Sequence, residues 1–189
     1  MEQTPGFQGI PPTTLADVLS RDDVMDIGIR SLTGVPGRLA GPAFTVRCPP
    51  GDNLMVHAAI YRAEPGSVVV VDTGGDVDHA VAGGNVMAVA QRRGIAGFVI
   101  DGVIPIPGAK AVVKPHNVTV RCGDVTVHPG DIVVADEEGI VVVPGARKDE
   151  VFAAARAKLA KDEAESLDDW ERAHRARIDK ILADGGFEG

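Results

Sequence analysis

The chain has 189 residues, of which 44% are hydrophobic and 24% charged, a composition typical of soluble globular proteins. Its formal net charge of -8 argues against nucleic-acid binding, because neutralising phosphates requires a basic face. No apolar run approaches the roughly 18 residues of a membrane span, and residues 1–12 lack the features of a signal peptide. We therefore expect a cytoplasmic protein that does not enter membranes.

The first elements predicted along the chain are a short helix, a strand and a second helix. Thr13 or Thr14 would cap the first helix, with Asp17 in its first turn, where a carboxylate favours the helix dipole. Residues 43–48 predict a strand that ends at a Pro-Pro-Gly turn, and residues 53–61 predict the second helix.

Continuous apolar runs dominate the next part of the chain. A Pro-Gly turn precedes residues 67–72, and the same pattern recurs before residues 131–136. Residues 97–100 and 140–143 have the same character, which predicts strands covered on both faces. By contrast, residues 118–121 and 125–127 alternate between apolar and polar side chains, as half-exposed antiparallel strands do.

The two cysteines lie in strand-like segments far apart in the sequence. Neither Cys48 nor Cys122 belongs to a metal-binding spacing, and we expect two buried reduced thiols.

Helical segments complete the prediction. Residues 86–93 predict a helix that opens at a small-residue turn. After Pro144 the composition shifts to Ala, Lys, Glu and Arg, and Ser166 with Asp169 has the form of a capping box. We therefore predict an α/β domain over residues 1–146 and a helical extension over residues 147–189, which would pack on the same or a neighbouring subunit.

A set of short motifs, in this order and spacing, closely resembles the RraA-like superfamily, which includes 4-hydroxy-4-methyl-2-oxoglutarate aldolases and the RNase E inhibitor RraA. The motifs are Gly41-Pro42-Ala43, Pro50-Gly51-Asp52-Asn53, Asp72-Thr73-Gly74-Gly75-Asp76, Arg93-Gly94-Ile95-Ala96-Gly97, Asp101-Gly102 and His128-Pro129-Gly130-Asp131. The resemblance implies a swivelling β/β/α sandwich. It also implies a homotrimer or a dimer of trimers, with active sites between subunits.

In the aldolases of this family, a turn that opens a helix holds the carboxylate of a pyruvyl unit. A later Arg-Asp pair binds substrate and, through water, Mg²⁺. The turn corresponds here to Gly83, Gly84, Asn85 and Val86, which we expect to bind substrate. Pro105 and Ile106 stand at the positions of the pair, so we expect no bound metal by the usual route. The segment from residue 102 to 118 is also shorter than in relatives, by roughly fifteen to twenty residues of a kind often used in active sites.

Other polar residues offer candidates for a relocated site. Asp76, His79 and Asp101 are the catalytic candidates, since carboxylates and a histidine near a Gly-rich turn suit acid–base chemistry. The alternative is that the aspartates cap turns and helices, as they often do. Lys110 and Lys114 could replace the lost arginine as anchors for a carboxylate, or be solvated surface residues.

Three functions are compatible with the sequence. The favoured one is a divergent enzyme that binds a small carboxylate or oxo-acid and catalyses a lyase- or isomerase-type step without the Arg-Asp pair and without a cofactor. The alternative is a catalytically inactive trimer that regulates or binds another protein. An ordinary Mg²⁺-dependent aldolase is the least favoured function.

Overall fold

The computed structural model of the chain describes residues 6–32, 37–103 and 109–186. It forms two compact units, residues 1–155 and 156–189. Helix α4 (Lys148–Ala164) contributes its first half to the first unit and its second half to the other. The predicted boundary after residue 146 stays a prediction.

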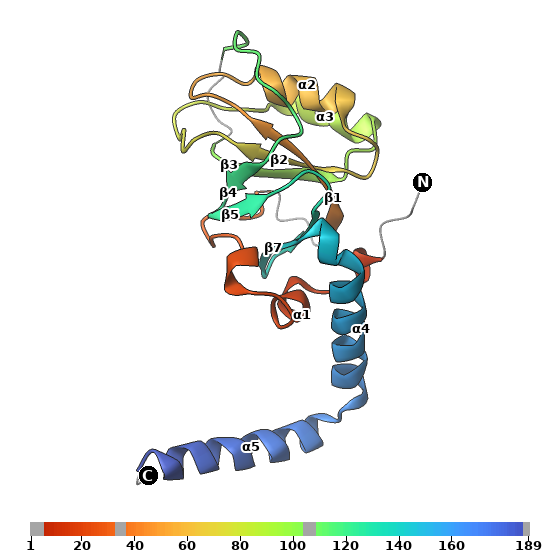
Figure 1. Cartoon of the computed structure of the whole chain (residues 1–189), viewed down its shortest axis with the longest axis vertical. Helices are drawn as coiled ribbons and strands as arrows, with labels where there is room; N and C mark the ends of the chain where they lie inside the picture. The colour runs from red at the N-terminus through yellow and green to blue at the C-terminus, as the bar shows by residue number, and fades with distance from the viewer. Residues whose placement is uncertain (1–5, 33–36, 104–108, 187–189) are drawn as a thin grey trace. The chain divides into compact units, whose positions relative to one another are not determined.

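The first unit is built around a five-stranded sheet with the strand order β3-β2-β1-β6-β7 (Figure 1). Strands β1 (Leu39–Arg47), β2 (Val68–Asp72) and β3 (Gly97–Asp101) are parallel to one another. Strands β6 (Ile132–Asp136) and β7 (Gly139–Val143) continue the sheet in antiparallel fashion from the first half of β1. The carboxyl ends of the three parallel strands therefore lie together, with Arg47, Asp72 and Asp101 in register.

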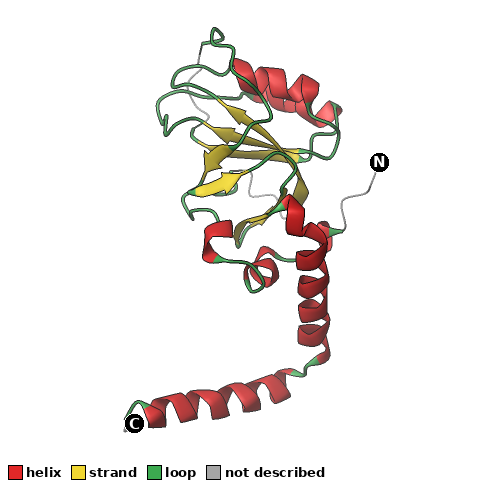
Figure 2. Ribbon diagram, in the orientation of Figure 1, coloured by secondary structure: helices red, strands yellow, loops and turns green. Residues whose placement is uncertain are grey.

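One face of the parallel strands is covered by two helices, which lie side by side in Figures 1 and 2. They are α2 (Leu54–Arg62) and α3 (Gly84–Arg92). Alternate valines of the strands pack against Val56, Ile60 and Val86 of these helices. Because the strands carry an apolar side chain at nearly every position, the opposite face is apolar as well.

The opposite face packs against a two-stranded antiparallel sheet, β4 (Val120–Cys122) and β5 (Val125–Val127). The alternating pattern that predicted this hairpin is confirmed, because both strands bury every second residue. With helices on one face and strands on the other, the expected β/β/α sandwich is confirmed.

A third apolar cluster joins β6 and β7 to the N-terminal segment and to the start of α4. Helix α1 (Pro12–Ala16) lies here and buries Leu15. Our prediction for its start was wrong: Pro12 occupies the first helical position, and Asp17 is at the C-terminal end. Proline is favoured at the first position because its fixed φ suits the helix and no N–H is needed there.

Burial of the apolar strands matches the prediction for β2, in which every residue is buried. β3 is also covered on both faces: Val99 packs with the hairpin-side cluster, and Phe98 and Ile100 pack against the helix-side cluster. Only Val99 is fully buried within the chain. β3 pairs with β2 alone among the described strands, so one side of it borders solvent.

Helix α5 (Leu167–Asp184) belongs to the second unit and begins at the predicted cap. The Ser166 hydroxyl accepts a hydrogen bond from the backbone N–H of Asp169, 3.2 Å away, and Gly185 follows the last turn. No helix in the described ranges is long and apolar enough to cross a membrane.

Both thiols are reduced and buried, which confirms that prediction. Burial raises the pKa of Cys48 to about 11 and that of Cys122 to about 12. Neither thiol therefore provides a thiolate for catalysis at neutral pH.

Gly41 lies where β1 approaches the turn before β2. A Cβ at this position would overlap the backbone carbonyl oxygen of Gly66. We expect Gly41→Ala to lower the free energy of unfolding by about 3 kcal/mol, because backbone cannot move away as a flexible side chain can. Urea denaturation would measure the change, with Gly9→Ala as control, since a Cβ there meets nothing within 4 Å. Equal urea midpoints for Gly41→Ala and Gly9→Ala would contradict the predicted overlap with the Gly66 carbonyl.

Candidate functional site

A cleft of about 1190 Å³ runs along the solvent-bordering side of β3. Besides β3 itself, its walls include Gly83 and Gly84, residues between Asp26 and Leu32, and the turn between β6 and β7. The cleft therefore gathers segments that are far apart in the sequence, next to the carboxyl end of a parallel strand. Ligands of open α/β sheets commonly bind at that end of the strands.

The N-terminus of α3 opens onto this cleft. Gly83 precedes the helix in an extended conformation, with φ of -145° and ψ of 176°, and no side chain of the described residues caps it. The N–H groups of the first turn, from Gly84 to Val86, have no partner within the helix. A Cβ at Gly83 or Gly84 would meet nothing within 4 Å, so the backbone is open to a ligand. This arrangement suits an anion, because the helix dipole adds to the N–H donors.

The four predicted substrate-binding residues do not contribute equally. Gly83 and Gly84 line the cleft, whereas Val86 is buried in the core beneath α3. Asn85 is exposed and is not part of the described lining. The turn can therefore act through its backbone, and the side chain of Val86 serves the fold.

Asp101 ends β3 and lines the cleft. Its Oδ2 accepts a hydrogen bond from the backbone N–H of Gly123 at 2.9 Å. Its backbone carbonyl accepts another from the Thr73 hydroxyl at 2.6 Å. These contacts fix a half-buried carboxylate at the edge of the cleft.

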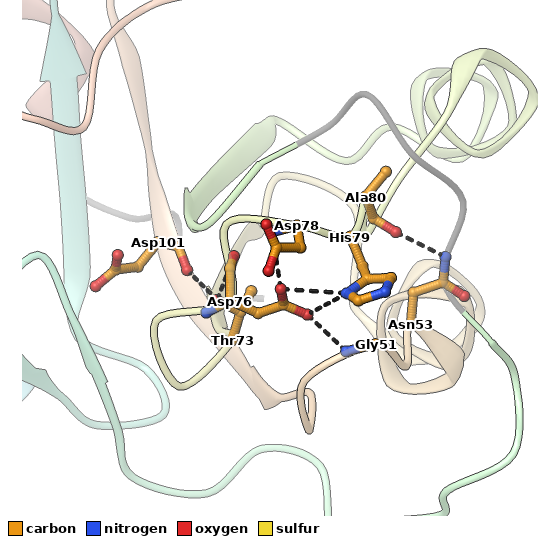
Figure 3. A network of polar contacts seen from close by, with 8 residues as sticks. All are labelled: Gly51, Asn53, Thr73, Asp76, Asp78, His79, Ala80 and Asp101. Atoms are coloured by element: carbon orange, nitrogen blue, oxygen red, sulfur yellow. Dashed lines mark hydrogen bonds and ion pairs between the residues drawn. The ribbon is translucent and has the colours of Figure 1, made fainter.

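Asp76 and His79 form a pair in the loop between β2 and α3 (Figure 3). The Asp76 carboxylate accepts hydrogen bonds from the backbone N–H groups of Gly51 (2.5 Å) and Asp78 (2.9 Å). The Nδ1 of His79 lies 3.1 Å from Asp76 Oδ2. The N–H groups of Asp78 and Gly51 lower the pKa of Asp76, and His79 adds to this effect against the opposing effect of burial. In neutral His79 this contact favours the proton on Nδ1, which leaves Nε2 as an acceptor.

Thr73 links this pair to Asp101. Its hydroxyl donates to the Asp101 carbonyl and accepts from the N–H of Asp76 at 3.2 Å. Figure 3 shows the Asp101 carboxylate directed away from Asp76 and His79. Asp101 lines the cleft, whereas Asp76 and His79 are not among its described lining residues. Catalytic roles for the three residues stay a prediction, and the two backbone contacts of Asp76 show that it also caps its loop.

The shortened segment is held by a residue that we had not singled out. Asp52 is 5% exposed and accepts hydrogen bonds from the backbone N–H groups of Leu54, Ala111 and Val112. Lys110 and Lys114 are exposed and do not belong to the described lining of the cleft. Pro105 and Ile106 lie outside the described residues.

Arg30 is a second residue that sequence reasoning missed. It is the one lysine or arginine among the described lining residues, and its Nε donates to the carbonyl of Ile27 at 3.0 Å. Nothing in the sequence indicates its proximity to residues 83 and 84, because more than fifty positions separate them. Only the folded chain brings this cation to the cleft.

The described residues do not form an evident metal site. They include no group of three or more His, Cys, Asp or Glu side chains placed to hold an ion. At the position of the family's usual ligand, Ile106 has no oxygen or nitrogen in its side chain. The prediction that the family's Mg²⁺ site is missing rests on the sequence at Ile106 and stays a prediction.

Comparisons with known proteins agree with this architecture. The sequence profile of the RraA-like family, described as Aldolase/RraA, matches residues 13–105 and 103–142. A protein of Halalkalibacterium halodurans with the provisional name 4-hydroxy-4-methyl-2-oxoglutarate aldolase is 36% identical over 197 residues, which cover 93% of each chain. An uncharacterized protein from Pseudomonas syringae pv. tomato has a solved structure with a TM-score of 0.71 and 28% identity, covering 83% of both chains. The RNA-processing inhibitor RraA from Thermus thermophilus has a TM-score of 0.64 and 27% identity, over 71% of this chain and 92% of its own.

Proposed function

This chain belongs to the RraA-like family, and on that premise we propose that it binds a small oxo-acid and catalyses a lyase- or isomerase-type step in the cleft beside β3. The observation that carries the proposal is the uncapped N-terminus of α3, whose residues Gly83 and Gly84 line that cleft. The provisional name of the relative from Halalkalibacterium halodurans supports a 4-hydroxy-2-oxo acid as the substrate class.

In the proposed complex, the substrate carboxylate accepts hydrogen bonds from the first-turn N–H groups of α3. This contact places the neighbouring oxo group against the same positive end of the helix, where negative charge on its oxygen is stabilised. Stabilisation of this kind needs no movement of the protein during the reaction, because the donors belong to the backbone.

For a 4-hydroxy-2-oxo acid, the proposed step is a retro-aldol cleavage. A base removes the proton of the 4-hydroxyl group, the bond between C3 and C4 breaks, and its electron pair passes to the enolate of pyruvate. A proton then returns to C3. Asp101 is the base we propose, because it lines the cleft with its position fixed by Gly123 and Thr73. The Asp76–His79 pair is a second proton-transfer candidate, whose imidazole Nε2 would need to reach substrate.

We propose that this step proceeds without the Arg-Asp pair that binds substrate and Mg²⁺ in the family's aldolases. Pro105 has no guanidinium with which to hold substrate, and Ile106 has no ligand for Mg²⁺. The hydrogen bonds from α3 and the cation of Arg30 are then the groups that offset the charge of the enolate.

The first experiment is an assay of pyruvate release from 4-hydroxy-4-methyl-2-oxoglutarate and from oxaloacetate, with added Mg²⁺ and with EDTA. We expect turnover of both substrates to persist in EDTA. Release from 4-hydroxy-4-methyl-2-oxoglutarate should be lost in Asp101→Asn, because the amide cannot accept the hydroxyl proton, whereas decarboxylation of oxaloacetate removes no such proton. His79→Gln would separate the two proton-transfer candidates. Turnover that requires Mg²⁺ would overturn the metal-free mechanism, and turnover unchanged in Asp101→Asn would remove Asp101 as the base.

The alternative function, an inactive regulatory or protein-binding trimer, is favoured by apolar side chains in the same cleft. Leu32 and Val77 line it although they are 76% and 68% exposed in the single chain. Covering them with another chain would favour association, and we propose that copies of this chain meet here as a homotrimer or a dimer of trimers. Failure of pyruvate and oxalate to bind, measured by calorimetry, would favour the regulatory function over the enzymatic one.

A further inference from the structure

We propose that helix α5 pairs with α5 of a second copy, antiparallel, around a twofold axis at His174. The proposal concerns an interface between copies and is independent of the proposed reaction. It starts from the apolar side chains that α5 exposes.

Helix α5 carries large hydrophobic residues without burying any residue. Its exposed fractions are 75% for Leu167, 49% for Trp170, 37% for Ile178, 55% for Ile181 and 39% for Leu182. In proteins most helical stability comes from packing of an apolar face and not from the helix propensity of the sequence. A covering partner is therefore expected.

The apolar face is symmetric along the sequence. Residues 167, 170, 174, 178 and 181 follow one another at intervals of three, four, four and three positions, so that they share one side of the helix. This order is the same when it is read from either end, with residue 174 at its centre. A stripe of that kind complements an identical stripe running in the opposite direction.

The antiparallel pairing makes three kinds of layer. Leu167 meets Ile181 of the second copy, Trp170 meets Ile178, and His174 meets its own equivalent on the axis. Within one helix the rings of Trp170 and His174 already stack, with centroids 4.6 Å apart and planes at 9°. The middle of the stripe is therefore aromatic in each copy, and aromatic rings pack well against one another.

Charges favour the antiparallel direction over the parallel one. The first turns contain Asp168, Asp169 and Glu171, whereas Arg175, Arg177 and Lys180 follow in the second half. Parallel helices would place the acidic turns side by side, which costs free energy. Antiparallel helices place the acidic turns of each copy opposite the more basic half of the other.

Two cross-helix contacts follow from this direction. On one flank, Glu171 lies near Arg175 of the second copy, whose guanidinium is held only loosely in its own helix, 3.9 Å from Asp179. On the other flank, Arg177 lies beside the Trp170 ring of the second copy, a cation–π geometry. Because the contact is twofold, each occurs twice. A twofold contact cannot close within a trimer, so it would join two trimers.

A disulfide test reports the axis directly. In the full-length His174→Cys variant, mild oxidation should produce a covalent dimer on a non-reducing gel, because the two sulfur atoms face each other on the axis. Ala176→Cys, on the opposite side of the helix, is the matched control and should remain uncrosslinked. The native Cys48 and Cys122 are 1% and 0% exposed and do not compete. Equal crosslinking of both variants, or none of His174→Cys, would overturn the proposed axis.

Light scattering after size-exclusion chromatography tests the interface itself. Ile178→Glu should halve the mass of the assembly or shift its association to an about tenfold higher concentration, because a charge replaces a covered apolar group. Ala176→Glu places the same charge on the opposite side and should leave the mass unchanged. If α5 instead covered another part of the protein, Ile178→Glu would leave the mass of the assembly unchanged, which would refute pairing between α5 helices.

Discussion

Gly84→Pro is expected to lower pyruvate release, and the affinity for pyruvate or oxalate, by roughly 100-fold. Gly84 is the first residue of α3, a position where proline suits the helix but lacks the N–H that would bind the substrate carboxylate. The extended backbone of Gly83 is also compatible with a following proline. The variant therefore removes one donor while the helix that carries it is retained.

Gly84→Ala is the matched control for this prediction. It keeps the N–H, and its Cβ meets nothing within 4 Å. Calorimetric titration with pyruvate and with oxalate would measure affinity, and circular dichroism would verify that both variants are folded. If the proline variant bound these anions as well as the alanine variant, the N-terminus of α3 would not be the carboxylate site.

Asp52→Ala is expected to lower the free energy of unfolding by about 3 kcal/mol or more, since buried N–H donors would lose a charged acceptor. The carboxylate joins the start of α2 to Ala111 and Val112, with distances of 2.9, 2.6 and 3.0 Å to the three N–H groups. Urea denaturation at neutral pH would measure the loss. Asp149→Ala, at an exposed position in the first turn of α4, is the control and should change stability little.

The same carboxylate should make stability sensitive to acid. Burial raises the pKa of Asp52, but the three backbone N–H groups and the charge of Lys110 together lower it below the ordinary value. A lowered folded-state pKa contributes stability above the unfolded aspartate pKa of about 3.9, and this contribution is lost as the pH falls through the folded value. The difference in stability between the wild type and Asp52→Ala should therefore shrink below about pH 4. A difference that is constant from pH 7 to pH 3 would show that Asp52 contributes no such dependence.

Much of the fold could be predicted because its signals are local. The valine run of β2 requires burial on both faces, the alternation in β4 and β5 requires one buried face, and Ser166 caps the helix that it precedes. Each signal depends on a few neighbouring side chains. For the same reason the small residues that open α3 could be predicted to form an anion-binding turn, since the donors belong to the backbone.

A prediction was wrong where a local signal has two interpretations. At α1, Thr13 and Thr14 are good capping residues, yet Pro12 begins the helix before them. At β3 the apolar residues correctly predicted a strand covered on both faces, but its place at the end of the strand order leaves most of its residues only partly buried within the chain. The sequence contained the residue types, and the arrangement of the chain determined their use.

The sequence by itself determined the family, the sandwich of strands and helices and the buried thiols. It also predicted an anion-binding turn at the start of α3 and the loss of the Arg-Asp pair at Pro105 and Ile106, which stay predictions. Only the tertiary structure decided which groups share the cleft: it brings Arg30 and Asp101 to the turn at Gly84 and leaves Asp76 and His79 in a capped loop beside it. The physical reason is the distance along the sequence over which the stabilising contacts act. Secondary structure and caps follow from contacts between residues a few positions apart, whereas a cleft is formed by strand order, which depends on packing between segments that are distant in the sequence.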